Sequence, residues 1–177
     1  MPAKPPRVFT LSRISSPIGE ILLVTDAAGR LRALDFHDYE ERLHRLLRRH
    51  YGEAQLVGGE TPAALAAALR AYFAGDLAVL DTIAVETEGT AFQRKVWAAL
   101  RRIPAGATLS YGALAAQIGS PKAVRAVGLA NGANPVGIIV PCHRVIGADG
   151  ALTGYGGGLA RKQWLLAHEG VRVGKAA

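Results

Sequence analysis

The spacing of apolar residues changes partway along the chain, and this change limits the possible folds more than any other feature of the sequence. Over the first 36 residues, apolar positions alternate with polar ones or form short runs that end at turn-forming residues. Such alternation is typical of β-strands in a sheet with one buried face. Three strands are therefore expected, over residues 7–16, 20–25 and 31–36.

Helical spacing replaces this alternation after the third strand. A charged amphipathic helix is expected over residues 38–49, where leucines recur on one face. A second helix is expected over residues 62–74. Thr61 is a candidate N-cap for it, and Pro62 is suited to the first helical position.

The chain of 177 residues is long enough for one domain or for two small ones. Residues 77–89 form a mixed strand and linker, and this segment predicts a boundary between domains at 1–89 and 90–177. The fold class expected is α/β to α+β in two lobes. The first lobe would be a small antiparallel sheet with helices, and the second would be mainly helical.

The second half carries clear helix signals. Thr90 and Gln93 have the spacing of a capping box at the start of one helix. Ser110 is expected to cap a short helix that runs to about Ile118, and Gly119 would end it. Ser120-Pro121 would start the next helix, which runs to about Asn131. Two short helices across a tight turn predict a helix-turn-helix.

Charge is distributed unevenly between the two halves. Residues 1–89 carry 10 Lys and Arg against 12 Asp and Glu, whereas residues 90–177 carry 11 against 2. A basic second half indicates a polyanionic partner such as nucleic acid, although a merely basic surface gives the same count. No signal peptide and no apolar run of membrane-spanning length is found, so a cytoplasmic protein is expected.

Cys142 is the only cysteine, which excludes an intramolecular disulfide and a cysteine-rich zinc site. It follows an apolar segment over 135–141 that predicts a short buried strand or extended piece. Lone cysteines are often small buried hydrophobes. Here His143 and Arg144 follow directly, and positive neighbours favour the reactive thiolate, so Cys142 is a candidate nucleophile.

The string Pro141-Cys142-His143-Arg144-Val145-Ile146 resembles the active-site motif of the O6-alkylguanine-DNA alkyltransferases, in particular their bacterial Ogt type. The resemblance is strong over about residues 90–170, and the first 89 residues resemble the variable N-terminal domain of the family more loosely. Further matching segments lie on both sides of the motif: Tyr111–Ala115, Ala123–Gly128, Asn134-Pro135, Gly154–Leu159 and Lys162–Gly170.

The resemblance implies a ribonuclease-H-like first lobe and a second lobe that holds the helix-turn-helix and the site. It implies transfer of the alkyl group from O6-alkylguanine, and from O4-alkylthymine, in duplex DNA to Cys142. The target base is flipped out of the duplex from the minor-groove side. Each monomer would act once, because the thioether product is stable, and no cofactor is implied.

The family pattern also assigns catalytic roles by position. Cys142 matches the nucleophile, and His143 matches the base that takes the thiol proton through a water. Glu169 matches the acid that holds this histidine; it also falls at the end of a helix over 159–169, where the dipole disfavours a carboxylate without a cationic partner. Asn134 matches the residue that ties the helix-turn-helix to the active-site segment.

Substrate and DNA contacts are implied in the same way. Tyr111 matches the phenol that donates to guanine N3, and Gly137 lies where pocket width is set. The remaining pocket contacts would be made by the backbone: Cys142 and Val145 carbonyls, and N–H groups near Tyr155 and Gly156. The expected DNA contacts are Tyr111, Gln93, Ser120, Lys122 and Arg125.

Arg125 matches an arginine finger that fills the gap left by the flipped base. Val124 and Val127 are expected to mark the buried face of its helix, which would leave Arg125 pointing outward. Its alternative role is a plain phosphate contact.

Other functions explain less of the sequence. A helix-turn-helix regulator without alkyl transfer leaves the Cys142 string and the Glu169 helix without a purpose. A cysteine hydrolase needs a histidine placed opposite the nucleophile, and this is rarely the next residue. No metal is expected, because a charged helix explains the histidines at 37, 44 and 50.

Overall fold

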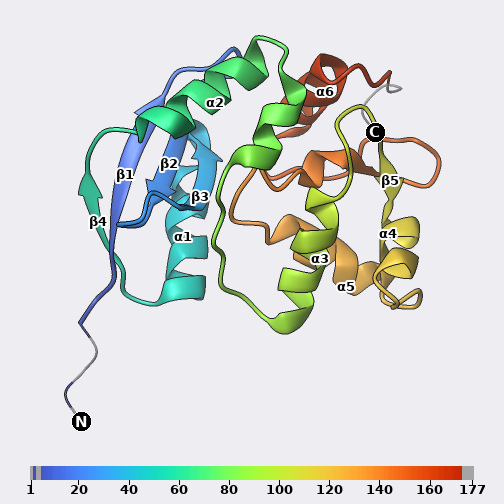
Figure 1. Ribbon diagram of the computed structural model, residues 1–177. Coiled ribbons are helices and arrows are strands. Elements are labelled where there is room, and N and C mark those ends of the chain that lie inside the picture. The colour runs from blue at the N-terminus through green and yellow to red at the C-terminus, as the bar shows by residue number, and fades with distance from the viewer. Residues whose placement is uncertain (1, 3–4, 173–177) are drawn as a thin grey trace.

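A four-stranded sheet forms the N-terminal part of the computed structural model, which describes residue 2 and residues 5–172 (Figure 1). The three expected strands are present, and the sheet is mixed because a fourth strand runs parallel to the first, whereas the other neighbours are antiparallel. The ends of the two expected domains, residues 1, 3–4 and 173–177, lie outside the described residues. The strands, in spatial order, are β3 (Leu31–Phe36), β2 (Ile21–Thr25), β1 (Val8–Ile14) and β4 (Gln55–Gly58).

The strand β4 was not expected from the sequence. The chain leaves β3, crosses one face of the sheet as α1 (Glu40–Tyr51) and returns beside β1. Because β4 is a mostly exposed edge strand of four residues, it lacks the apolar alternation that marks β1. Its position follows from the path of α1, which no local pattern reports.

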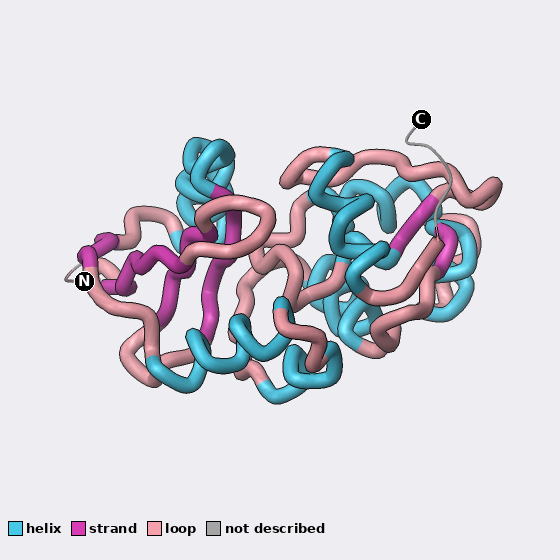
Figure 2. The backbone as a smooth tube through the Cα atoms, turned by 90° about the horizontal axis from the view of Figure 1, so that it is seen from above, coloured by secondary structure: helices cyan, strands magenta, loops and turns pink. Residues whose placement is uncertain are grey.

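Helices lie on both sides of the sheet (Figure 2). The helix α1 buries Leu43 and Leu47 against Phe9, Leu22 and Val24. The opposite face packs against α2 (Ala63–Phe73) and against the C-terminal part of the chain. Successive residues of a strand point to opposite faces of the sheet. Because both faces are covered, β2 is buried along its whole length.

The expected cap of α2 is wrong. Pro62 is the N-cap of this helix, and no side chain caps it. Thr61 instead donates its hydroxyl hydrogen to Ser12 Oγ in β1, at 2.8 Å. The hydroxyl satisfies a buried strand residue rather than the helix end, which is a tertiary contact that the local sequence does not show.

The C-terminal part is mainly helical, as expected. The capping box of Thr90 and Gln93 is confirmed, and so is the Ser110 cap, which accepts from the Ala113 N–H. Two short strands, β5 (Leu109–Ser110) and β6 (Val145–Ile146), pair in parallel and were not expected. The helices are α3 (Ala91–Arg101), α4 (Tyr111–Gln117), α5 (Val124–Gly132) and α6 (Leu159–His168).

The second helix of the helix-turn-helix begins later than expected. Pro121 and Lys122 lie in a turn that the Ser120 carbonyl closes by accepting from Ala123 N–H, so Ser120 is not an N-cap. Pro is equally suited to the second position of a β-turn, which explains the ambiguity. Lys122 therefore precedes α5, and Val124, at 40% exposure, does not mark its buried face.

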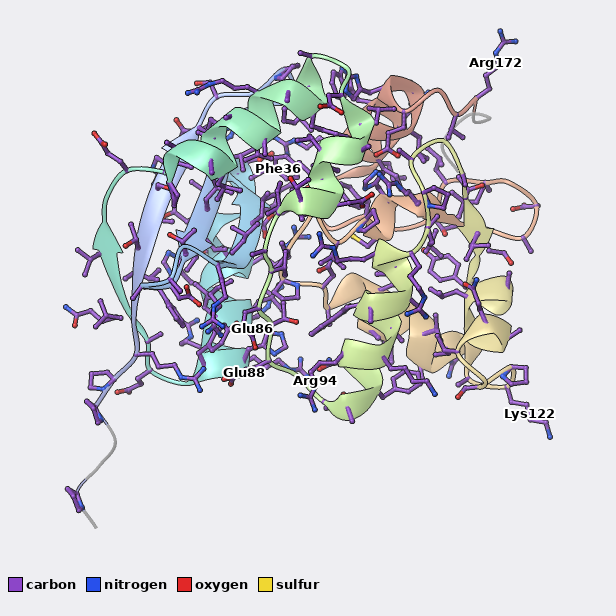
Figure 3. All side chains as sticks on the ribbon, in the orientation of Figure 1. Phe36, Glu86, Glu88, Arg94, Lys122 and Arg172 are labelled. Atoms are coloured by element: carbon purple, nitrogen blue, oxygen red, sulfur yellow. The ribbon has the colours of Figure 1, made fainter. Side chains whose placement is uncertain are left out.

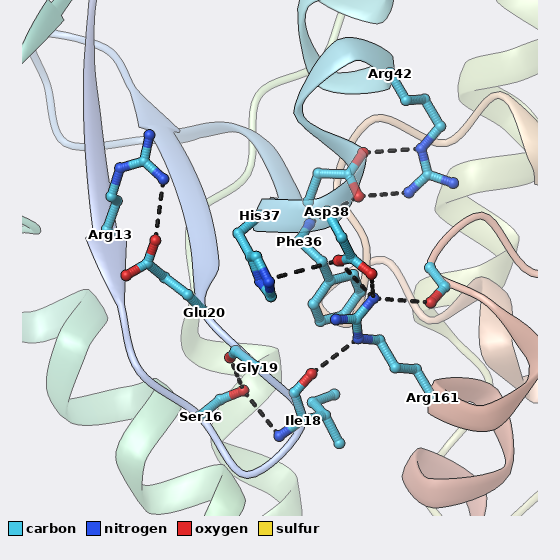
Figure 4. A network of polar contacts seen from close by, with 12 residues as sticks. Arg13, Ser16, Ile18, Gly19, Glu20, Phe36, His37, Asp38, Arg42 and Arg161 are labelled. Carbon is cyan, nitrogen blue, oxygen red and sulfur yellow. Dashed lines mark hydrogen bonds and ion pairs between the residues drawn. The ribbon is translucent and has the colours of Figure 1, made fainter.

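One hydrophobic core joins the two parts. It contains residues from β2, β3 and α2 together with residues from α3, α4 and α5. Arg161 of α6 also donates to the Ile18 carbonyl and pairs with Asp38 (Figure 4). No helix among the described residues is long and apolar enough to span a membrane.

Candidate active site

Cys142 starts a short 3-10 helix, Cys142–Arg144, that follows α5 and a tight buried segment. The segment expected over 135–141 as a buried strand or extended piece is buried except for the half-buried Gly137, but only Val136 pairs as a strand, with Leu34, and residues 137–139 form a turn. Ile138 has φ of 67°, a conformation that costs a β-branched residue about 1–3 kcal/mol. The surrounding core, in which Ile138 is fully buried, must hold this strained path in place.

Asn134 fixes the same segment from within. Its side-chain amide donates to the Val140 carbonyl at 2.8 Å, and its Oδ1 accepts from Val136 N–H at 3.0 Å. Because Asn134 lies two residues after the end of α5, the end of the helix-turn-helix and the approach to Cys142 are held by one buried side chain.

His143, Arg144 and Glu169 form a buried network beside the cysteine. His143 Nε2 lies 2.8 Å from Glu169 Oε1. Arg144 donates through Nε to Oε2 and through Nη2 to Oε1, each at 2.9 Å. Glu169 is the C-cap of α6, so its carboxylate lies at the negative end of the helix, where the Arg144 guanidinium is its cationic partner and His143 is a second hydrogen-bond partner.

Burial and pairing together set the protonation states of this network. Burial alone would raise the pKa of Glu169, but the hydrogen bonds from His143 and Arg144 outweigh it and lower the pKa to about 2. Burial lowers the pKa of His143, although the hydrogen bond to Glu169 and the charge of that carboxylate act to raise it. Burial also raises the pKa of the Cys142 thiol, while Asn134, Lys162 and Arg42 favour the thiolate. The resting site therefore pairs a neutral thiol and a neutral imidazole with a charged carboxylate.

Lys162 of α6 is fully buried and organises the loop opposite the cysteine. Its ammonium donates to the carbonyls of Val145, Thr153 and Gly154, at 2.7, 2.8 and 3.3 Å. Burial lowers the pKa of Lys162 to about 8, and the Cys142 charge opposes this shift. The ammonium thus ties the segment that follows Cys142 to the loop at Thr153 and Gly154.

A small cavity of about 20 Å³ adjoins Cys142. Its lining includes Asn134 and three of the expected pocket residues, Gly137, Tyr155 and Gly156, whereas Tyr111 and Val145 do not line it. This volume is close to that of a single water and far below that of a base. A flipped base can enter only if part of the lining moves.

Arg42, from α1, fills much of the space above Gly156. A Cβ atom at Gly156 would lie 1.5 Å from Arg42 Nη1. The guanidinium is held by Asp35, to which it donates at 2.8 Å and 2.6 Å (Figure 4). Asp35 is buried and Arg42 is partly exposed, so Arg42 is the member of the pair that can swing out.

A substitution tests this packing. Gly156→Ala is expected to destabilise the protein by about 1–3 kcal/mol, because the new methyl group displaces Arg42 from Asp35. The loss should largely disappear when Arg42→Ala is already present. Urea denaturation of the double-mutant cycle measures it. Gly112→Ala, where a Cβ meets nothing, is the control. Equal losses in both backgrounds would show that Arg42 does not occupy this space.

The expected DNA contacts lie around the helix-turn-helix. Gln93 and Tyr111 lie in the first turns of α3 and α4, and Arg125 is exposed near the start of α5. Lys122 extends away from the molecule at the turn before α5 (Figure 3). Ser120 begins this turn and is partly exposed. Gln93 is held in its capping box and the Tyr111 hydroxyl meets Thr153, whereas Lys122 and Arg125 are exposed to solvent.

Two candidate side chains have unpaired polar atoms within the described part of the chain. Tyr155 Oη and His143 Nδ1 are both buried without a hydrogen-bond partner. The two rings meet edge to face at 6.5 Å beside the cavity. Tyr111 differs, because its hydroxyl lies 3.3 Å from the carbonyl and hydroxyl oxygens of Thr153.

Sequence reasoning missed the N-terminal contribution to this site. Arg42 and Asp35 had no signal beyond a charged helix and a strand end. Tyr72 of α2 also reaches the site: its hydroxyl donates to Glu169 Oε1 at 2.8 Å. A tyrosine within an otherwise alanine-rich helix was the only available sign of its position.

Comparisons with known proteins match both parts of the chain. The model for the 6-O-methylguanine DNA methyltransferase ribonuclease-like domain matches residues 11–87, and that for the DNA binding domain of the same family matches residues 91–171. The methylated-DNA–protein-cysteine methyltransferase of Salmonella typhimurium is 53% identical over 160 residues, which is 89% of this chain and 94% of that protein. Its counterpart from Mycobacterium tuberculosis is 53% identical over 132 residues, 73% and 79% of the two chains.

Solved structures agree with the fold. The crystal structure of Mycobacterium tuberculosis O6-methylguanine methyltransferase has a TM-score of 0.74 at 43% identity and covers 91% of this chain and 92% of that one. The structure of the same organism's protein in complex with DNA has a TM-score of 0.75 at 44% identity, with coverage of 90% and 92%. The two family models and these relatives span nearly all of the described residues, and the chain belongs to the 6-O-methylguanine DNA methyltransferase family.

Proposed function

We propose that this protein repairs DNA by direct reversal, moving the alkyl group from O6 of guanine in duplex DNA to Cys142. The observation that carries the proposal is the placement of the chain's single thiol, which lies beside the buried His143–Glu169–Arg144 network and at a cavity under the helix-turn-helix part. The family relatives are named for this reaction, and one was solved with DNA.

The chemistry is a displacement at a saturated carbon. The Cys142 sulfur forms a bond to the alkyl carbon, the bond from that carbon to O6 breaks, and guanine leaves. A thiolate suits this step because sulfur is soft and strongly nucleophilic. The thioether product has no carbonyl that water can attack, so each molecule acts once. We extend the substrate class to O4-alkylthymine, which presents the same alkyl–oxygen bond.

Thiol activation requires that its proton moves to His143. The two residues are neighbours in sequence, and the cavity beside Cys142 has the volume of one water. We infer that a water carries the proton to His143 Nδ1, a buried atom without a hydrogen-bond partner among the described residues. Glu169 orients the imidazole and stabilises its charged form, as a carboxylate does for the histidine of a hydrolase triad. Asn134 holds the segment that presents the sulfur.

The base would be recognised mainly by main-chain groups. The Val145 carbonyl accepts from Lys162 and keeps a second lone pair for the exocyclic amine of guanine. The Cys142 carbonyl already accepts from the Val145 N–H and from the Asn131 amide at 3.4 Å, so it would give up the longer of these contacts to meet the guanine amine. N–H groups near Tyr155 and Gly156 would face O6, and Tyr111 would donate to N3. Gly137 would set the width at the alkyl end, where a Cβ atom would contact Leu34 and the Tyr155 hydroxyl.

The DNA would lie on the helix-turn-helix face, approached from the minor groove. Arg125 would take the place of the extruded base, while Gln93, Ser120 and Lys122 contact the backbone. We propose that residues 90–177 bind DNA and carry out the alkyl transfer, and that residues 1–89 support them. We further propose a monomer in the cytoplasm, since an oxidising compartment would consume the single nucleophilic thiol.

Stoichiometry gives the direct test. After exposure to duplex DNA that contains O6-methylguanine, mass spectrometry of the Cys142 peptide should show one methyl group per chain and no more. Cys142→Ser should bind the same DNA with unchanged affinity and accept nothing. Repeated turnover by one molecule would contradict the mechanism, and DNA binding without transfer would favour a regulator.

A further inference from the structure

The carboxylate of Glu169 is crowded on one side. Its Oε1 atom accepts from His143 Nε2, from Arg144 Nη2 and from Tyr72 Oη, whereas Oε2 accepts only from Arg144 Nε among the described residues. A carboxylate oxygen offers about two lone-pair directions. Three donors on Oε1 therefore compete for its charge, and Tyr72 is one of them.

Tyr72 is held in this position at both ends. Its side chain is fully buried, its hydroxyl meets Glu169, and its backbone carbonyl accepts from His168 Nε2 at 2.7 Å. The rings of Phe73 and His168 pack against its own ring edge to face, each with centroids 5.1 Å away. All of this comes from α2, which lies outside the helix-turn-helix and outside the Cys142 segment.

We propose that Tyr72 is a positioning residue for alkyl transfer: its hydroxyl shares the Glu169 oxygen that holds His143 and so limits the charge that this oxygen offers to the imidazole. The inference rests on the proposed function, since it concerns how the thiol of that reaction is activated. It gives the N-terminal part of the chain a direct place in the catalytic network.

The other charged groups around Glu169 do not replace this contact. Arg144 donates to both oxygens of the Glu169 carboxylate. The Lys162 ammonium makes its hydrogen bonds to backbone carbonyls such as that of Val145. Tyr155 and Cys142 are neutral in the resting site, because burial raises the pKa of both. Burial and then the Glu169 charge also raise the pKa of Tyr72, so that its hydroxyl remains a donor throughout the working range.

Removal of the hydroxyl should make His143 a stronger base. With two donors left, Oε1 directs more charge to the imidazole, and the protonated form of His143 becomes more stable. At neutral pH a larger share of the Cys142 thiol proton then lies on His143, whereas in acid His143 keeps a solvent proton up to a higher pH. Loss of one hydrogen bond of ordinary strength corresponds to a shift of about half to one pH unit.

The test is the pH dependence of single-turnover methyl transfer from saturating O6-methylguanine duplex, in wild type and Tyr72→Phe. The midpoint of the rising limb, which is set by loss of the proton from His143, should move up by about half to one unit, and transfer above the midpoint should become about three- to tenfold faster. The ring packing is kept in this variant. Tyr51→Phe removes the hydroxyl of a partly exposed tyrosine that donates to the Glu86 carbonyl, and it should leave the profile unchanged.

Two results would overturn the inference. An unmoved midpoint with wild-type rates would make the hydroxyl a passive core group. An equal loss of rate at every pH, with the midpoint in place, would reduce Tyr72 to structural support. A wild-type protein that transfers no methyl group would instead reject the proposed function, so the two failures remain distinct.

Discussion

Glu169→Gln is expected to slow alkylation of Cys142 by at least about 100-fold at neutral pH, the usual scale for loss of assisted proton transfer. The amide cannot stabilise a charged His143, so the thiol must ionise without help. The deficit should shrink as the pH rises toward the thiol's own pKa, which burial holds above its ordinary value. Rates for saturating duplex substrate across the pH range measure this. A deficit that is equal at all pH values would contradict the assignment.

His143→Gln should lose a similar amount, and the double variant should lose little more than either alone. Residues that act as one unit give strongly non-additive losses, because removing either member disables the other. Independent losses that multiply in the double variant would mean that Glu169 and His143 act separately.

Glu169→Gln also lowers the free energy of unfolding, and this loss must be measured beside the rate. Gln at 169 leaves the buried Arg144 without a charged partner, and breaking such a pair costs about 3–5 kcal/mol. Because the pKa of Glu169 falls to about 2 on folding, its charge stabilises the fold above the unfolded pKa of about 4.3. This contribution, on the order of 3 kcal/mol, is lost as the pH falls from about 4.3 to about 2.

Urea denaturation at several pH values separates the two effects. The difference in unfolding free energy between wild type and Glu169→Gln should be largest at neutral pH and should narrow in acid. Glu53→Gln, at an exposed position, should follow the wild-type curve at every pH. Parallel curves for wild type and Glu169→Gln would show that Glu169 is not ionised in the resting fold.

Local signals predicted the parts of this fold that depend on local chemistry. The capping box at Thr90 and the Ser110 cap are satisfied within three residues of the helix start, so the sequence contains everything that they need. Thr61 and Ser120 carried the same kind of signal and failed. The Thr61 hydroxyl donates instead to Ser12, a strand residue 49 positions away. Ser120 begins a turn that contains Pro121, and its carbonyl accepts from the Ala123 N–H.

The candidate site also has a part that the local sequence predicts and a part that depends on tertiary packing. Cys142, His143 and Arg144 are adjacent in the chain, and Glu169 was placed by a motif. The contribution of Tyr72 and Arg42 depends on how α1 and α2 pack against the second half, 97 residues from Glu169 in the case of Tyr72. No spacing rule reports a contact of that kind, because it forms only when the helices pack together.

Arg125→Ala is expected to slow repair of duplex DNA at saturation by about 30-fold and to leave reaction with free O6-benzylguanine nearly unchanged. Arg125 is exposed near the start of α5, on the face that also presents Leu129 at 72% exposure. A planar guanidinium there can enter the stack and donate hydrogen bonds together. Extrusion of a base costs a few kcal/mol, and loss of about 2 kcal/mol of compensation gives the stated factor.

Lys122→Ala is the matched control, because Lys122 is exposed on the neighbouring turn and carries the same charge. Loss of a phosphate contact there should weaken DNA binding and lower its salt slope by about one unit, with the rate at saturation kept. The decisive quantity is the rate ratio of variant to wild type on duplex against free base. If Arg125→Ala behaves like Lys122→Ala, or slows both substrates equally, Arg125 does not fill the gap left by the flipped guanine.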